Sequence, residues 1–155
     1  MREPIFTGTL QVSVVVPDLE AAMRTYADDY GIGPWHVYEF NPDNVQGMHE
    51  GGEPVAHSWR LALASVGDVQ WELVQPLEGD SVYARFLAEH GPGVHHVGVG
   101  VRDFQRTVDE HEVLLGGTYN GVTFAYLSTD RDLGVVTEIF DGAPGEGQEP
   151  DAVYP

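Results

Sequence analysis

The feature that most constrains this 155-residue chain is an internal repeat. Residues 10–31 read LQVSVVVPDLEAAMRTYADDYG, and residues 95–116, which begin 85 positions later, read HHVGVGVRDFQRTVDEHEVLLG. Each segment begins with an alternating Val-rich run typical of a strand. Each then reaches an Asp, Asp18 or Asp103, suited to a helix N-cap, and continues with helical spacing to its closing Gly. The repeat therefore predicts two strand–helix units.

Further strands follow each predicted helix, separated by turn residues. Half-repeats of this size rarely bury a core alone, so two of them side by side predict an α+β fold. A curved sheet would carry helices on its outside and a cavity, shared by both halves, on its concave face. We predict strands at 35–40, 57–65, 69–75, 122–128 and 134–140, a joining helix at 81–90, a mobile loop at 41–54 and a loosely ordered tail at 142–155.

Composition excludes several classes of protein. The chain has no Cys, which excludes disulfides, thiolate metal sites and cysteine nucleophiles. Its net charge of -18 repels nucleic acid phosphates and anionic membranes. It contains no apolar run long enough for a signal peptide or a membrane span. We therefore expect a single soluble, cytoplasmic domain whose partner is a small molecule, with no nucleic acid and no membrane.

Strand parity selects four polar residues. Alternate valines of the two repeated strands must pack on the helices, so Gln11 and His96 point to the opposite, concave side. The runs WELV (71–74) and TEIF (137–140) each place one carboxylate, Glu72 or Glu138, among apolar residues. A lone buried carboxylate is costly, and it needs a cation, a hydrogen-bond donor or a metal as partner.

These four residues together predict a metal site. Any one of them alone would more often be a structural polar residue, but all four occupy repeat-related positions. Three oxygens and one imidazole nitrogen suit a six-coordinate divalent ion, and two carboxylates balance its charge. We therefore expect one divalent ion (Mn, Co, Ni, Fe, Zn or Mg) bound by Gln11, Glu72, His96 and Glu138, with water or substrate at the remaining positions.

The chain resembles the vicinal oxygen chelate (glyoxalase/bleomycin-resistance-like) superfamily, and most closely its methylmalonyl-CoA epimerase-like branch. The segments that carry the resemblance are QVSVVVPDLEAAMRTYADDYGIGPW, ELVQPLEGDSVYARFLAEHGPGVHHVGVGVRD and GVVTEIFDG. The resemblance implies paired βαβββ modules around a metal-containing cavity, usually assembled as a homodimer. It divides the single domain, 1–155, into module 1 (about 8–77), a linker helix (80–91), module 2 (about 94–142) and a flexible tail (143–155).

The predicted ligand set departs from that of the epimerases, which is commonly His, Gln, His and Glu. It is closer to a set seen in animal-type glyoxalase I. That type of glyoxalase carries an Arg on its first strand to hold glutathione, where this chain has Val15. It also has an Asn after the second ligand, where this chain has Pro76. The second catalytic glutamate of the epimerases aligns, within a residue or two, with Arg60.

The metal set and the family branch favour an epimerase or racemase that acts on a carbon α to a carbonyl. The metal, as Lewis acid, would stabilise the enolate oxygen while a carboxylate removes the α-proton. Glu138 is the first choice of base and Glu72 the second. Arg60 is expected to stabilise the enolate, and His57 to shuttle a proton.

Aromatic residues of the first half indicate a flat substrate. Trp35, Tyr38 and Trp59 are expected to line the cavity, whereas parity places Trp71 opposite Glu72, in the core. Combined with the acidic charge, they favour a neutral aromatic ketone over an acyl-CoA.

Three alternatives stay open. The ligand set also suits a glyoxalase-type lyase or isomerase, which Val15 and Pro76 oppose. A non-catalytic, resistance-type protein that binds a small molecule would lack the metal set. An extradiol dioxygenase would use two histidines and one carboxylate on iron, and only His96 lies in the proposed set.

Overall fold

The computed structural model describes residues 1–145 and 147–155. Within them, an 11-stranded mixed sheet has the order β11-β2-β5-β6-β1-β7-β10-β9-β8-β3-β4. The elements are β1 (Phe6–Val15), α1 (Leu19–Tyr30), β2 (Trp35–Phe40), β3 (Val45–Glu50), β4 (Glu53–Pro54), β5 (Trp59–Val66), β6 (Val69–Pro76), α2 (Val82–His90), β7 (Gly93–Val101), α3 (Phe104–Glu110), β8 (Val113–Tyr119), β9 (Val122–Leu127), α4 (Asp130–Leu133), β10 (Val136–Asp141) and β11 (Ala152–Tyr154).

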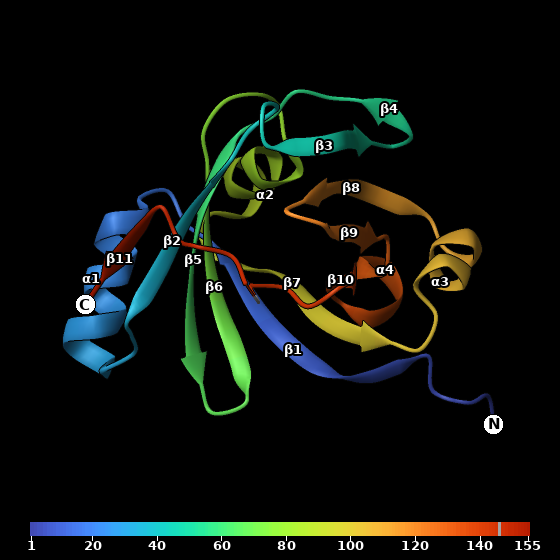
Figure 1. Ribbon diagram of the computed structural model, residues 1–155, viewed down its shortest axis with the longest axis horizontal. Helices are drawn as coiled ribbons and strands as arrows, with labels where there is room; N and C mark the ends of the chain where they lie inside the picture. The colour runs from blue at the N-terminus through green and yellow to red at the C-terminus, as the bar shows by residue number, and fades with distance from the viewer. Residues whose placement is uncertain (146) are drawn as a thin grey trace.

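Two modules of the same topology meet in the middle of this sheet. Module 1 is built from β1, α1, β2, β5 and β6, and module 2 from β7, α3, β8, β9 and β10. In each module the first strand is parallel to the last, β1 to β6 and β7 to β10, and β1 pairs antiparallel with β7 across the join. Figure 1 shows the curved sheet with α1 and α3 outside it at opposite ends. The prediction of two paired βαβββ modules forming a curved mixed sheet is confirmed.

The N-caps of the two repeated helices form as predicted, but the second helix is shorter. The side chain of Asp18 accepts a hydrogen bond from Ala21 N at 3.0 Å, and Asp103 accepts one from Arg106 N at 3.0 Å. The prediction of a helix to the end of the repeat is wrong in module 2, where α3 ends at Glu110 and β8 follows. Pairing of β8 with β9 buries the apolar side chains of β8 in the sheet, and this outweighs their helical spacing.

The segment 41–54, predicted as a mobile loop, contains β3 and β4. β3 leaves module 1 and pairs antiparallel with β8 of module 2, so it extends the sheet on the far side (Figure 1, top). Val45 and Met48 are buried in the core of the concave side, which stabilises β3 despite the Gly and Asn content of the segment 41–54. This pairing joins residues far apart in sequence, and local composition carries no signal for it.

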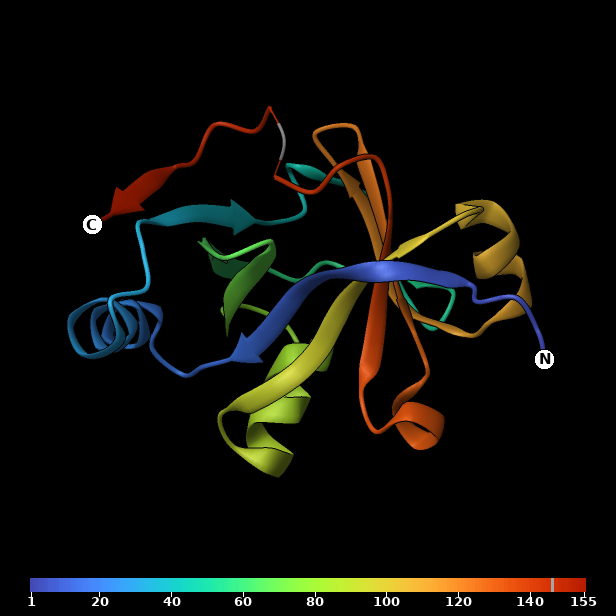
Figure 2. The same cartoon turned by 90° about the horizontal axis from the view of Figure 1, so that it is seen from below.

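The C-terminal segment was predicted as a loose tail, and its described part is ordered by pairing. β11 lies antiparallel to β2 at the edge of the sheet (Figure 2). The carboxylate of Asp151 accepts a hydrogen bond from Glu39 N at 2.7 Å. The predicted tail includes residue 146, which lies outside the described residues. The segment therefore returns to module 1 after β10 rather than leaving the domain.

Buried side chains form one cluster under each outer helix and a third on the concave side. Leu19 and Met23 of α1 pack with Trp35 of β2, whereas Leu127 and Ile139 lie on the α3 side. Among the described residues, no helix combines the length and hydropathy needed to cross a membrane. The concave cluster is rich in aromatic residues, and the candidate site is built on it.

The pairing of β3 with β8 generates a test. A Cβ added at Gly117 would lie 2.8 Å from Val45 Cγ1 and 3.2 Å from Phe124 Cζ. Gly117→Ala should therefore lower the free energy of unfolding by about 1–3 kcal/mol through overpacking. Chemical denaturation measures this, and hydrogen exchange should show weaker protection of β3.

Gly8→Ala is the matched control, because a Cβ at Gly8 meets nothing within 4 Å. It should change the unfolding free energy by less than about 0.5 kcal/mol. Equal stability of the two variants would contradict the packing of β3 on β8.

Candidate functional site

The four predicted ligands come from the four central strands of the sheet. β1 carries Gln11, β6 carries Glu72, β7 carries His96 and β10 carries Glu138. Their exposed fractions are 2%, 5%, 0% and 5%. Candidate ligand atoms of the two carboxylates and the imidazole all lie within 4.8 Å of one another, and Gln11 lines the same cavity as both carboxylates. The structure thus brings the predicted set together at the join of the two modules.

Two buried atoms of this set have no hydrogen-bond partner among the described residues. They are Gln11 Oε1 and His96 Nε2. The amide nitrogen of Gln11 donates to Gln70 Oε1 at 2.5 Å, which leaves its oxygen free. His96 Nε2 lies 3.0 Å from Glu138 Oε2 and 3.3 Å from Glu72 Oε1. Buried polar atoms are rarely unpartnered, so the free Gln11 oxygen indicates a missing ligand, and His96 Nε2 faces the two carboxylates without a well-directed hydrogen bond to either.

The charges of the site also favour a cation. Burial raises the pKa of Glu138 to about 7, and the charge of Glu72 adds to the effect although His96 opposes it. Burial lowers the pKa of His96, but the close contacts with both carboxylates and their negative charges outweigh burial and raise the pKa to about 9. Two carboxylates and a neutral imidazole would balance one divalent ion. The donor set therefore fits a divalent metal.

His95 contacts the candidate ligand His96, and strand parity alone did not predict this contact. Parity places His95 on the helix side with the valines, but the register of β1 and β7 shifts between Ser13 and Val14. This bulge brings His95 Nδ1 to 2.9 Å from His96 Nδ1. Burial, with the charge of His96, lowers the pKa of His95 to about 3, so its ring is neutral. When His96 uses Nε2 as a ligand, its Nδ1–H donates to His95 and orients the ring.

The cavity above the ligands is mostly aromatic. Tyr38 and Trp59 line it, in accordance with the sequence prediction. Trp35 does not, because it packs under α1 and its Nε1 donates to Ile32 O at 2.8 Å. No Arg or Lys lines the cavity within the described part of the chain. The other aromatic lining residues are Phe40, Tyr83, Tyr119, Phe124, Tyr126 and Phe140, and the C-terminal segment adds Pro144, Gly145 and Gln148.

Arg60, expected at the enolate, lies on the other face of the sheet. Its neighbours on β5, Trp59 and Leu61, face the cavity, so strand alternation turns Arg60 outward. There its Nη1 donates to Glu20 Oε1 of α1 at 2.6 Å. The placement of Arg60 in the catalytic set is therefore corrected.

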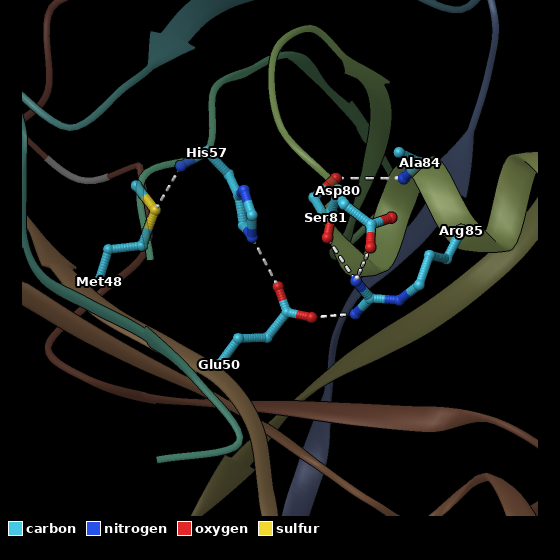
Figure 3. Close-up of polar contacts among 7 residues, drawn as sticks. All are labelled: Met48, Glu50, His57, Asp80, Ser81, Ala84 and Arg85. Carbon is cyan, nitrogen blue, oxygen red and sulfur yellow. Dashed lines mark hydrogen bonds and ion pairs between the residues drawn. The ribbon is translucent and has the colours of Figure 1, made fainter. Parts of the chain in front are cut away.

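His57, expected as a proton shuttle, also lies outside the cavity lining. Its Nε2 lies 2.9 Å from Glu50 Oε2, and its backbone N donates to Met48 Sδ at 3.3 Å (Figure 3). The other carboxylate oxygen of Glu50 pairs with Arg85 of α2. These contacts join β3 to the linker helix rather than to the metal ligands.

Two tyrosines of the cavity were not predicted. Tyr83 lies on α2, where strand parity gives no information, and Tyr126 lies on β9. Their hydroxyl oxygens are 2.5 Å apart. Tyr126 pairs with Glu138 of β10, and paired residues of neighbouring strands share a face, but this register is known only from the structure.

Comparison with known proteins agrees with this architecture. A family model described as the glyoxalase/bleomycin resistance protein/dioxygenase superfamily matches residues 10–113. A search of curated protein sequences finds no match.

Solved structures with the same fold include methylmalonyl-CoA epimerases. That of Mycobacterium tuberculosis is 25% identical, with a TM-score of 0.65 and coverage of 93% of each chain. A variant of the Streptomyces coelicolor enzyme, in complex with 2-nitronate-propionyl-CoA, is 24% identical, with a TM-score of 0.66 and coverage of 90% of this chain and 96% of that one. Because the family model spans more than half of the 155 residues, the chain belongs to the glyoxalase/bleomycin resistance protein/dioxygenase superfamily.

Proposed function

We propose that this protein is a divalent-metal-dependent epimerase or racemase that acts on a carbon α to a carbonyl. The observation that carries the proposal is the buried set of Glu72, His96 and Glu138 beneath an aromatic cavity, with two unpartnered ligand atoms. Such a reaction needs a base whose pKa lies near neutrality and a group that stabilises charge on the carbonyl oxygen. The site has candidates for both.

The residues that would hold the ion are those with free lone pairs. Gln11 would use Oε1, His96 would use Nε2, and Glu72 and Glu138 would each use a carboxylate oxygen. When bound, a divalent ion supplies Lewis acidity toward the carbonyl oxygen of a substrate.

Glu138 is the better base of the two carboxylates. Glu72 is restrained, because its Oε1 accepts a hydrogen bond from Ser13 Oγ at 2.7 Å. Glu138 accepts no hydrogen bond from a hydroxyl group among the described residues, and its Oε2 lies 3.0 Å from His96 Nε2. Glu72 remains the second acid–base group, since Arg60 and His57 lie outside the cavity. A proton removed by one carboxylate would be returned on the other face of the carbon by the second group.

The lining of the cavity supports a neutral aromatic ketone as substrate. Aromatic side chains dominate it, and within the described residues it contains no cation that would bind a phosphate or carboxylate. The net charge of -18 further disfavours a polyanionic acyl-CoA. A flat, uncharged ligand fits these walls and brings a carbonyl oxygen toward the ligand set.

Metal content is the first test. Protein purified without a histidine tag or chelator should contain about one divalent ion per chain, measured by elemental mass spectrometry, as a four-ligand site implies. His96→Ala should lose the ion, because it removes the nitrogen ligand. His36→Ala is the control, because His36 is exposed on β2, and it should keep the ion. Absence of metal after reconstitution would overturn the proposal.

Affinity for the metal should depend on pH. In the ion-free site the pKa of His96 is about 9 and that of Glu138 about 7, so binding must displace their protons. Affinity should therefore rise with pH, by about tenfold per pH unit for each proton displaced. Competition with a chromophoric chelator between about pH 6 and pH 9 measures the slope. An affinity independent of pH would contradict this assignment of ligands.

The base is tested by α-proton exchange. Aromatic ketones with a stereogenic α-carbon should exchange that proton with solvent deuterium, as followed by NMR. Glu138→Gln should slow the exchange by at least about 100-fold, since general bases contribute 10²–10⁴-fold. Glu110→Gln, at a surface residue paired with Arg106, is the matched control and should exchange normally. Exchange retained in Glu138→Gln would remove Glu138 from this role.

A further inference from the structure

The hydroxyl groups of Tyr83 and Tyr126 contain one more proton than their mutual hydrogen bond uses. Both side chains are buried and line the cavity, and their oxygens are 2.5 Å apart. One hydroxyl donates and the other accepts, so the accepting hydroxyl still has its own O–H to donate. Within the described residues, no acceptor for that O–H is seen. A buried donor without an acceptor is costly, which indicates that a ligand provides one.

The pair keeps both protons at neutral pH. A tyrosine hydroxyl is protonated at neutral pH, because the unperturbed pKa of a phenol is about 10. The spare group is therefore an O–H donor rather than an anion. It also lies beside the candidate metal centre, because the rings of Tyr126 and His96 have centroids 4.5 Å apart.

Tyr83 is held in place by contacts of α2 and β3, which lie outside the two repeated strand–helix units. Ser81 caps α2 by accepting a hydrogen bond from Ala84 N at 3.1 Å, and Arg85 of the same helix pairs with Glu50 of β3. Glu50 also contacts His57, so β3, the chain before β5 and the start of α2 are tied together (Figure 3). This network fixes α2 against β3 and thereby positions the hydroxyl group of Tyr83.

Tyr126 is held by the sheet itself. It lies on β9 directly opposite Glu138 of β10, and β9 also pairs with β8 on its other side. A donor held from two independent elements is preorganised, so it would need little rearrangement to meet a ligand.

We propose that the Tyr83–Tyr126 pair is the hydrogen-bond donor for the carbonyl oxygen of the ligand in this cavity. The free hydroxyl donates to the same carbonyl oxygen that the metal would polarise. The pair therefore selects ligands that have a hydrogen-bond acceptor at this position. A ligand of the same shape without the oxygen leaves the O–H unpaired and binds more weakly. The chemical role in an enolate reaction rests on the proposed function, whereas the binding role requires only the cavity.

Two probes of the same shape separate hydrogen bonding from packing. Acetophenone has the acceptor, and α-methylstyrene replaces its oxygen by a methylene group. The measured quantity is the ratio of the two dissociation constants, α-methylstyrene over acetophenone, for the full-length protein both as purified and after chelator treatment. The carbonyl ¹³C shift of bound acetophenone is recorded as a second readout.

The unmodified protein should bind acetophenone saturably, with a downfield carbonyl shift. In the double variant Tyr83→Phe/Tyr126→Phe, the ratio should fall by about tenfold, the typical effect of leaving a buried donor unpaired, and the downfield shift should be lost. The single variants identify the terminal donor, since the one that lacks it should lose more of the shift. Tyr26→Phe, in the α1 cluster, is the control and should behave as the unmodified protein.

Three outcomes would overturn the proposal. The first is an unchanged ratio with unchanged affinities in the double variant. The second is an unchanged ratio with an equal fold loss of affinity for both probes, which indicates a packing role. The third is no saturable binding of acetophenone by the unmodified protein. Thermal unfolding checks that each variant is folded. If the double variant does not fold, the same comparison is made with the two single variants. The ratio is also measured without metal, so the binding proposal can be supported when the metal and exchange tests fail. Likewise, the metal and exchange tests can succeed when the ratio does not change.

Discussion

The structure depends on the burial of two carboxylates around one imidazole. Glu72 and Glu138 come from equivalent closing strands of the two modules, and His96 lies between them on β7. Removing two like charges from water at this distance is unfavourable, and a single protonated His96 compensates only one of them. The pKa of Glu138, raised to about 7, expresses the remaining cost. A divalent ion would remove this cost, and for this physical reason the site is a candidate metal centre.

The candidate ligands could be found in the sequence because two simple periodicities apply to them. Side chains alternate along a strand, and the repeat relates strands of one module to those of the other. Together they place Gln11 and His96 at equivalent positions of the first strands, and Glu72 and Glu138 on the closing strands, with all four expected on the concave side. The same alternation could have corrected the placement of Arg60. Trp59 and Arg60 are adjacent on β5, so both could not face the cavity.

The remaining features depend on contacts that no local pattern contains. The bulge in β7 that brings His95 to His96 arises from a register shift against β1. β3 is stabilised by β8, which lies in the other module, and the C-terminal strand is stabilised by β2. In each case the partner is distant in sequence, so composition predicted a loop or a tail. Dimerisation and a cytoplasmic location stay predictions.

The chemistry and the selectivity of the site come from different parts of the chain. The central strands, which the repeat generates, supply the candidate ligands. The cavity above them is completed by parts that occur once: α2 with Tyr83, and the C-terminal segment with Gln148, whose backbone oxygen lies 3.4 Å from Tyr38 Oη. β3 does not line the cavity, but its Glu50 pairs with Arg85 of α2. Changes in these single-copy parts alter the shape and hydrogen bonding of the cavity without disturbing the ligands. For this reason a related protein can share the fold and a metal centre and still act on a different carbonyl compound.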